Sequence, residues 1–249
     1  FRVPIAGSVV QLYLAGLSGG YRLDVADPTN PVALAAFEPA SGFSIAVEGG
    51  AALLAERFVG LRVLTADNLE ALALVPNAGF SNKLHLDGPY LHVADLGGGV
   101  RIWDLTDPSA PAYVSDTPTP PNTQDLAVAG GVSFVVNSND AGDGLWSLDV
   151  AVPQMPVVLD THDTGGAAMG LDVQGDRVYV ANGFGGLLVV DAADPAQLQT
   201  LGGLSLGANT FDVKVADQVA FVALFGGGLA SVDVAQPLSM SVLDQEAWG

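Results

Sequence analysis

Short apolar runs, separated by turns rich in glycine and proline, make up most of the chain. Examples are YLHVAD (90–95), VYVAN (178–182) and AFVAL (220–224), in which β-branched and aromatic residues are frequent. Runs of this length and composition favour β-strands rather than helices. The hydrophobic pattern therefore predicts an all-β protein built from many short strands.

A strand followed by a proline turn, as in GGVRIWDLTDPSAP (98–111), recurs along the chain about every 42 residues. Two strand-like runs precede each copy and one follows it. The residues that end the third run are Asp24, Thr65, Asp104, Asp149, Asp191 and Asp233. A four-stranded sheet cannot bury both of its apolar faces alone, whereas six sheets packed around an axis can.

The repeat thus predicts a six-bladed β-propeller of four-stranded antiparallel blades. We expect a single domain over residues 1–249. The expected blades span approximately 1–39, 40–78, 79–120, 121–165, 166–207 and 208–249.

The repeat core has the form G-L-x-V-x-D-x-x-D-P. It is well preserved in GGYRLDVADPTNP (19–31), GGVRIWDLTDPSAP (98–111) and GGLLVVDAADPAQL (185–198), and degraded in the other three units. These units resemble the LVIVD-repeat proteins, a family of bacterial and archaeal β-propellers that are often exported or held at the cell surface. The resemblance implies the propeller fold and an extracellular or cell-surface location, and it brings no catalytic residue with it.

The charge balance narrows the range of partners. The formal net charge is −19, with 27 acidic and 8 basic residues, and Lys83 and Lys214 are the only lysines. Such a field repels nucleic acid and anionic lipid. An acidic, lysine-poor surface suits a secreted protein, and a general acidic bias of the source proteome explains it equally well. We therefore expect a protein or a cell-envelope macromolecule as partner, and no nucleic acid.

Two absences in the sequence exclude further classes of protein. The chain has no cysteine, so disulfides, thiol catalysis and cysteine metal sites are excluded. The longest uncharged apolar run, 219–232, is interrupted by glycines and is shorter than the roughly 18 residues that a spanning helix needs. No membrane span is expected.

Polar residues recur at two aligned positions of the innermost strands, which line the channel of a propeller. Burying such charges requires that they be paired, so we favour a network of ion pairs. The alternative is a small anionic or polar ligand bound at the channel mouth. The channel-lining candidates are Arg2, Lys83, His85, Asp125, Asp172, Asp212 and Lys214. The arginines of the third strands, Arg22, Arg62 and Arg101, share one position and indicate repeat architecture.

One turn, residues 137–144, is longer than its counterparts and rich in Asn and Asp. Carboxylate and amide oxygens in a tight turn are typical calcium ligands, which makes Asn137, Asn139, Asp140 and Asp143 candidate metal ligands. Ala141 occupies a ligand position and no bidentate Glu follows, so an Asx-rich hairpin without metal is the favoured interpretation. Calcium is the one cofactor that the sequence suggests, and none is required by it.

The remaining turns are small and poor in acids, bases and nucleophiles, and we assign no catalytic residue. The preferred hypothesis is a non-enzymatic, exported or cell-surface propeller that acts as an interaction or structural module. The alternative is a calcium-dependent hydrolase or a lactonase-like enzyme with its site at the channel mouth. That alternative rests on fold analogy alone, because function follows from sites rather than folds.

Overall fold

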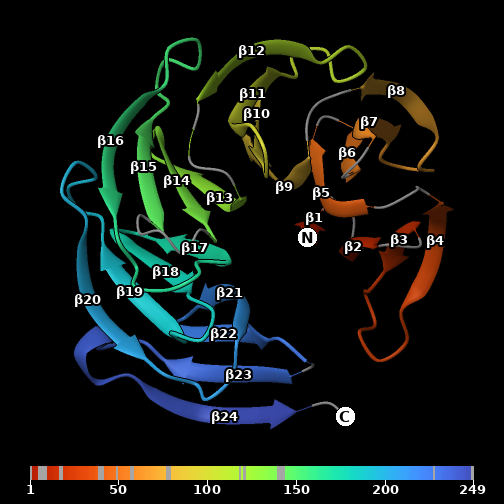
Figure 1. Ribbon diagram of the computed structural model, residues 1–249. Helices are drawn as coiled ribbons and strands as arrows, with labels where there is room; N and C mark the ends of the chain where they lie inside the picture. Colours follow the sequence, from red (N-terminus) through yellow and green to blue (C-terminus); the bar gives the residue numbers. More distant parts are fainter. Residues whose placement is uncertain are drawn as a thin grey trace. The chain divides into compact units, whose positions relative to one another are not determined.

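The computed structural model describes residues 2–4, 10–16, 19–38, 42–48, 50–56, 59–76, 80–117, 119, 122–138, 144–226 and 228–247. The fold is an all-β, six-bladed β-propeller, and each blade is a four-stranded antiparallel sheet (Figure 1). The contacts divide the chain into two compact units, Phe1–Asp116 and Thr117–Gly249.

The first unit contains three blades whose strands follow one another in chain order. Blade one consists of β1 (Arg2–Pro4), β2 (Val10–Gly16), β3 (Gly19–Asp24) and β4 (Val32–Phe37). Blade two consists of β5 (Gly42–Glu48), β6 (Ala51–Glu56), β7 (Gly60–Thr65) and β8 (Ala71–Pro76). Blade three consists of β9 (Ser81–Asp87), β10 (Tyr90–Asp95), β11 (Gly99–Asp104) and β12 (Ala112–Thr117).

The second unit repeats this organisation. Blade four consists of β13 (Thr123–Ala129), β14 (Val132–Asn137), β15 (Leu145–Asp149) and β16 (Val157–His162). Blade five consists of β17 (Gly170–Gln174), β18 (Arg177–Ala181), β19 (Leu187–Asp191) and β20 (Gln199–Leu204). Blade six consists of β21 (Thr210–Ala216), β22 (Val219–Leu224), β23 (Gly228–Asp233) and β24 (Ser241–Ala247).

Helix is almost absent from the described residues, which contain one short 3₁₀ turn, η1 (Pro237–Ser239). No helix in this part of the chain is long and apolar enough to cross a membrane.

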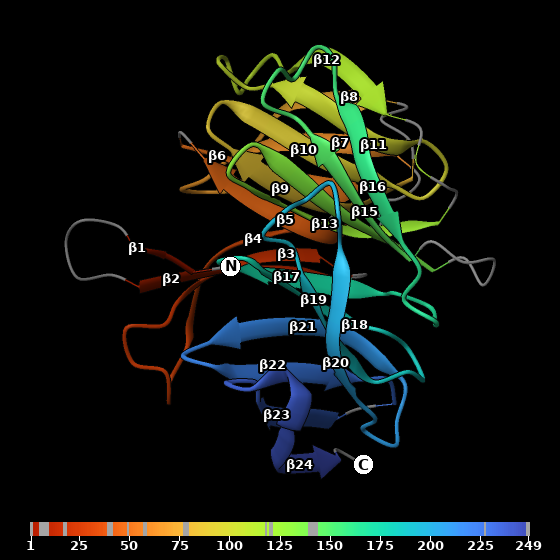
Figure 2. The same cartoon turned by 90° about the vertical axis from the view of Figure 1, so that its left-hand side faces the viewer.

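The core lies between blades rather than within them. One cluster joins blades two and three through Leu53, Val63, Leu84 and Leu91. Another joins blades five and six through side chains such as Val189 and Val222, and Figure 2 shows these two sheets stacked. Each blade therefore buries its apolar faces against its neighbours within the unit, as the repeat predicts.

The recurring form of the proline turn has a local cause. At the end of β11, the Asp104 carboxylate accepts a hydrogen bond from the backbone N–H of Thr106 at 2.7 Å. Three residues later, Asp107 accepts one from Ser109 N–H at 3.0 Å. Aspartates that bond to the backbone two residues ahead stabilise turns. The D-x-x-D-P sequence is thus a pair of such turns in succession.

Within each unit, turns of this kind also bond to the blade before them. In the first unit, the Tyr13 hydroxyl of blade one donates to the carbonyl of Ala66, in the turn of blade two, at 2.9 Å. In the second unit, Asp160 of blade four accepts from Leu198 N–H of blade five at 2.7 Å. A side chain at Gly202 would collide with the carbonyl of Pro237, so only glycine permits η1 to pack on β20.

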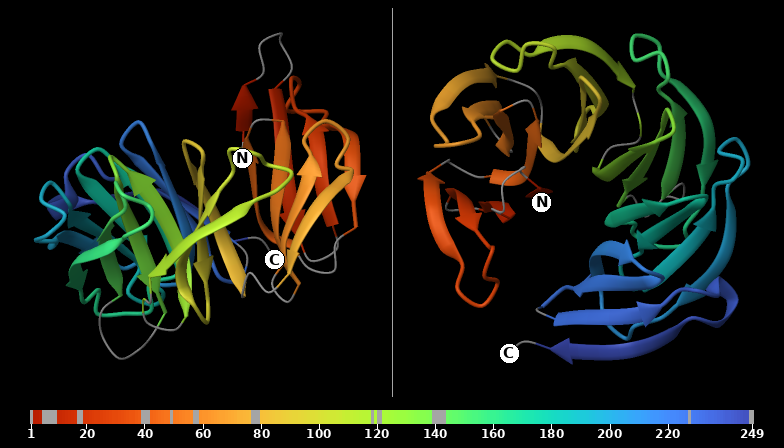
Figure 3. Two further views of the ribbon diagram at one scale, coloured as in Figure 1. Left: turned by 90° about the horizontal axis from the view of Figure 1, so that it is seen from above. Right: turned by 180° about the vertical axis from the view of Figure 1, so that it is seen from behind.

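Up-and-down strand order gives each unit two turn-bearing ends, which Figure 3 shows for the second unit. The turns between first and second strands and between third and fourth strands form the hairpin face. The turns between second and third strands, together with the connections to the next blade, form the connection face.

Candidate functional site

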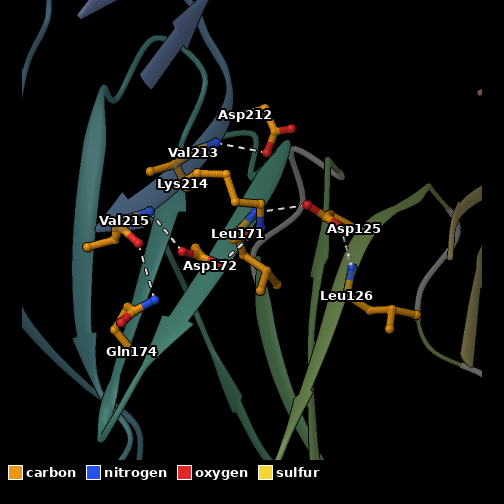
Figure 4. A network of polar contacts seen from close by, with 9 residues as sticks. All are labelled: Asp125, Leu126, Leu171, Asp172, Gln174, Asp212, Val213, Lys214 and Val215. Carbon is orange, nitrogen blue, oxygen red and sulfur yellow. Dashed lines mark hydrogen bonds and ion pairs between the residues drawn. The ribbon is translucent and has the colours of Figure 1, made fainter. Parts of the chain in front are cut away.

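Asp125 joins the first strands of blades four and five (Figure 4). Its side chain is buried, and its carboxylate accepts hydrogen bonds from the backbone N–H groups of Leu126 at 2.8 Å and Leu171 at 3.1 Å. Leu171 lies on β17, in the next blade. A register shift in β13 directly precedes Asp125, and such irregularities re-aim side chains.

Asp172 makes the equivalent link from blade five to blade six. One carboxylate oxygen forms an ion pair with Lys214 Nζ at 2.9 Å, and the other accepts Val215 N–H at 2.8 Å. Lys214 Nζ also donates to the carbonyl of Leu171 at 3.3 Å. Lys214 is thus held between a carboxylate and a carbonyl of the neighbouring blade.

Asp212 of blade six lies next to Gly170 of blade five, which has no side chain. Its carboxylate accepts Val213 N–H at 2.8 Å. A Cβ atom on Gly170 would come within 2.8 Å of the Asp212 carboxylate, so glycine at this position makes room for the aspartate of the next blade. The structure therefore brings Asp125, Asp172, Asp212 and Lys214 to adjoining first strands.

In the first unit, Lys83 and His85 lie on β9 at the same register positions as Asp125 and Ala127. Both residues interact with other groups of the protein. Arg2 does not have the alignment that the sequence predicts. It pairs with Leu12 in blade one, and this pair lies three register positions away from the pair that corresponds to that of Lys83 in blade three. β1 therefore follows a different register from the other first strands.

Asp125, Asp172 and Asp212 each accept a hydrogen bond from a strand amide. Ser44 repeats the arrangement in the first unit, where its hydroxyl accepts Leu84 N–H of the next blade at 3.1 Å. Groups that hold strand amides and pair with one another are poorly placed to act as free acids or bases. The bonds of Asp125, Asp172, Lys214 and Ser44 link neighbouring blades within each unit.

Sequence reasoning missed two buried ion pairs at the ends of second strands. Glu56 ends β6 and is fully buried, and both of its carboxylate oxygens contact the Arg62 guanidinium at 2.8 Å. Asp95 ends β10 and contacts Arg101 at 3.0 Å. The available signal was an acidic residue closing an apolar strand, with arginine six residues later in both blades.

The expectation that Arg22 shares the position of Arg62 and Arg101 is wrong. Arg22 pairs with Tyr13, one register position away from the equivalent pairs of the other two arginines. A shift of one residue turns a side chain to the other face of a sheet. Arg22 accordingly donates to Gln11 at 3.0 Å and to the carbonyl of Asp67 in blade two.

The connection face of the second unit carries three exposed phenylalanines that sequence reasoning also missed. Phe184, Phe211 and Phe225 are 84%, 51% and 72% exposed, and we call them the phenylalanine surface. Phe184 and Phe225 lie in turns between second and third strands, and Phe211 lies near the start of β21. The signal was a phenylalanine inside a glycine-rich turn, as in NGFGG and LFGGG.

Hydrogen bonds hold the segments of the phenylalanine surface together. The hydroxyl of buried Thr210 donates to the carbonyls of Gly183 and Gly186 at 3.0 Å each. Phe225 N–H donates to the carbonyl of Asn209 at 2.7 Å. The turns that bear Phe184 and Phe225 are therefore both fastened to the segment that leads into Phe211.

Comparison with protein families finds LVIVD repeats at residues 78–119, 165–203 and 207–244. The chain contains LVIVD repeats. The three stretches correspond to blades three, five and six. Blades three and five are two of the three units whose core is well preserved; the third, blade one, lies outside the matched stretches, and blade six is matched although its core is degraded.

Solved structures that resemble this chain share its fold at low sequence identity. A chain of the computationally designed Ika8 protein superposes with a TM-score of 0.72 at 10% identity, covering 98% of this chain and 72% of that one. A chain of a nidogen/laminin complex gives 0.67 at 13% identity, covering 96% and 93%. BamB from Moraxella catarrhalis gives 0.65 at 14% identity, covering 99% and 72%. Curated protein sequences give no match.

Of the four candidate metal ligands, the structure describes only Asn137. Asn139, Asp140 and Asp143 lie outside the described residues. Asn137 is buried at the end of β14, and its backbone N–H donates to the carbonyl of Gly144 at 3.0 Å. In the part of the chain that the structure describes, no three His, Cys, Asp or Glu residues are grouped to hold a metal ion.

Calcium binding by residues 137–144 stays the untested alternative to an Asx-rich hairpin without metal. If the turn binds calcium, titration with the ion raises the melting temperature, because a ligand that binds only the folded state stabilises it. Asp143→Ala then abolishes the rise. An unchanged melting temperature of the wild-type protein at millimolar calcium contradicts the prediction.

Proposed function

We propose that this protein acts by binding another protein through the phenylalanine surface, and that it does so without catalysing a reaction. The exposure of three phenylalanines on adjoining, hydrogen-bonded segments of one face is the observation that carries the proposal. Single exposed apolar residues are common on protein surfaces, whereas groups of them mark interaction sites.

Phenylalanine is an effective anchor for such a contact. An aromatic ring buries a large apolar area, and a few anchors of this kind supply most of the binding energy in protein interfaces. Because hydrogen bonds to Thr210 and Asn209 already hold the turns in place, little conformational entropy is lost when a partner binds. The surface is suited to recognise a preformed apolar site on another protein.

The charge of the chain specifies the partner further. At a net charge of −19, association with another acidic protein is unfavourable, and a basic partner is attracted at long range. We propose a partner whose apolar site is rimmed by lysine and arginine. Association should then slow as salt is added, because surface charges are screened.

Two further arguments support the proposal and its setting. The polar groups of the first strands bond to strand amides and to one another, which favours a structural role for them over catalysis. One similar fold is that of a chain in a nidogen/laminin complex, a structure of two associated proteins. The family resemblance supports an exported or cell-surface location.

The test is capture of partners from a cell-envelope extract by the wild-type protein and by Phe184→Ser/Phe211→Ser/Phe225→Ser. We expect the variant to retain at least about tenfold less of each specific partner, because the anchors are removed. Removing exposed side chains leaves the fold intact, which an unchanged melting temperature verifies.

A matched control changes exposed apolar residues on the hairpin face. Met155 and Leu238 are 70% and 91% exposed in the turns between third and fourth strands. Met155→Ser/Leu238→Ser should retain partners as the wild type does. Equal capture by all three proteins, or conversion of a substrate by a preparation that retains no partner, would overturn the proposal.

A further inference from the structure

A pocket lies on the hairpin face of the second unit, at the opposite end of the strands from the phenylalanine surface. It is formed where the first two strands of blade five, β17 and β18, meet those of blade six, β21 and β22. Its volume is about 350 Å³, near the lower end of the range for small-ligand sites. The lining residues are Gln174, Asp176, Arg177, Tyr179, Val215 and Gln218.

The wall of the pocket is fixed by bonds between the two blades. The side-chain amide of Gln174 donates to the carbonyl of Val215 at 3.2 Å, while Val215 N–H donates to Asp172 at 2.8 Å (Figure 4). The side chains of Tyr179 and Val215 are buried and supply an apolar floor. The pocket is therefore preformed, which lowers the entropy lost when a ligand binds.

The turn that bears Gln218 has an unusual backbone. Asp217 and Gln218 have φ values of 49° and 66°, in the left-handed region. The corresponding turns of blades two to five place glycine in this region, at Gly50, Gly88, Gly130 and Gly175. A left-handed glutamine is uncommon, and backbone strain of this kind collects at ligand sites.

Arg177 supplies a positive charge that is held in no close ion pair among the described residues, although Asp191 lies opposite it in the β18–β19 strand pair. It is half-buried, and among the described residues its guanidinium forms no hydrogen bond or ion pair. The other basic residues whose side chains the structure describes are all engaged, for example Arg62 with Glu56 and Lys214 with Asp172. In a chain with so few cations, an unpartnered arginine at a pocket indicates an anionic ligand.

We propose that this pocket binds a single carboxylate, carried either by a small organic acid or by the C-terminus of a peptide. The planar guanidinium of Arg177 presents paired donors that match the two oxygens of a carboxylate. The side-chain amide of Gln218 adds a neutral donor, and the Tyr179 and Val215 floor accepts an apolar group attached to the carboxylate. Asp176 and the net charge of −19 disfavour phosphate and other multiply charged anions.

The site is tested by NMR titration of the isotope-labelled full chain with three probes. Benzoate represents small acids, a short peptide with a free C-terminus represents chain ends, and the same peptide amidated is the neutral control. We expect saturable shifts of the Arg177 side-chain Nε–H and of the Gln218 amide with at least one carboxylate, and none with the amide. The stronger of the two carboxylate probes identifies the source.

Variants of the pocket complete the test. Arg177→Gln should weaken carboxylate binding at least about tenfold. Arg177→Lys keeps the positive charge but loses the paired N–H donors of the guanidinium, so its affinity should lie between those of the wild type and Arg177→Gln. Asp176→Asn should tighten binding, because it removes a repelling charge and the backbone carbonyl of Asp176 still accepts Ala192 N–H. Melting temperatures of the variants verify that they fold.

Three results would overturn the proposal. One is the absence of saturable shifts with either carboxylate up to about 50 mM. The others are equal binding by wild type and Arg177→Gln, and inorganic phosphate or the amidated peptide binding as tightly as the carboxylates. These outcomes are independent of the phenylalanine surface, which lies at the other end of the strands.

Discussion

Replacing Glu56 by alanine is expected to destabilise the protein by about 3–5 kcal/mol, the range for breaking a buried ion pair by removing one partner. The Glu56 side chain is fully buried, and its carboxylate makes two contacts of 2.8 Å with Arg62. The hydrogen bonds that the Arg62 guanidinium donates to this carboxylate raise the pKa of Arg62 above its ordinary value, so the arginine stays charged. Without Glu56, that charge remains at the end of a buried strand with its strongest partner gone.

The measurement is urea unfolding of Glu56→Ala beside a matched control, Glu70→Ala. Glu70 is exposed in the turn that precedes β8, and its removal should change the unfolding free energy by no more than about 0.5 kcal/mol. Glu56→Gln keeps a hydrogen-bond acceptor, so its unfolding free energy should lie between those of the wild type and Glu56→Ala. If Glu56→Ala unfolds at the same urea concentration as Glu70→Ala, the ion pair does not stabilise blade two.

Acid is expected to destabilise the protein through His92, by about 3 kcal/mol between pH 6.5 and pH 4. Burial lowers the pKa of His92 to about 4, an effect that nearby His85 reinforces and Asp87 opposes. Above the pKa of about 6.5 that His92 has in the unfolded chain, its side chain is neutral in both the folded and the unfolded protein, and His92 causes no loss of stability. As the pH falls from there, only the unfolded chain binds the proton, so stability is lost until the folded pKa is passed.

Unfolding curves of the wild type and His92→Leu, measured across this pH range, isolate the effect. Leucine is the residue at the same register position in blade two, Leu53, so the pocket is suited to it. The difference in unfolding free energy between the two proteins should shift in favour of the variant as the pH falls. Parallel curves from pH 7 to pH 4 would show that His92 takes up its proton equally well in the folded protein.

The fold was predictable because each repeat contains the sequence signals of its own strands and turns. The glycine-rich start of the third strand, its terminal aspartate and the Asp-Pro turn recur in register, and only strands fit in the intervals between them. Residues such as Asp104 and Asp107 act within their own turn. Local bonds of this kind can be inferred from sequence spacing alone.

The candidate site was less predictable, because it depends on register and on contacts between blades. Alignment placed Arg22 with Arg62 and Arg2 with Lys83, and a shift in strand pairing separates both sets. The exposure of Phe184 depends on which side of a turn its ring occupies. Spacing along a chain carries no information about either property.

Site-directed photocrosslinking tests directly whether a partner covers the phenylalanine surface. A photoreactive phenylalanine analogue, placed at position 184 or 225 on the connection face and at 155 or 238 on the hairpin face, reports which surface is covered in cells that express the protein. We expect adducts with a common protein partner from Phe184 and Phe225, and none from Met155 and Leu238. Adducts from the hairpin-face positions alone, or from no position, would contradict the claim that the phenylalanine surface binds a partner.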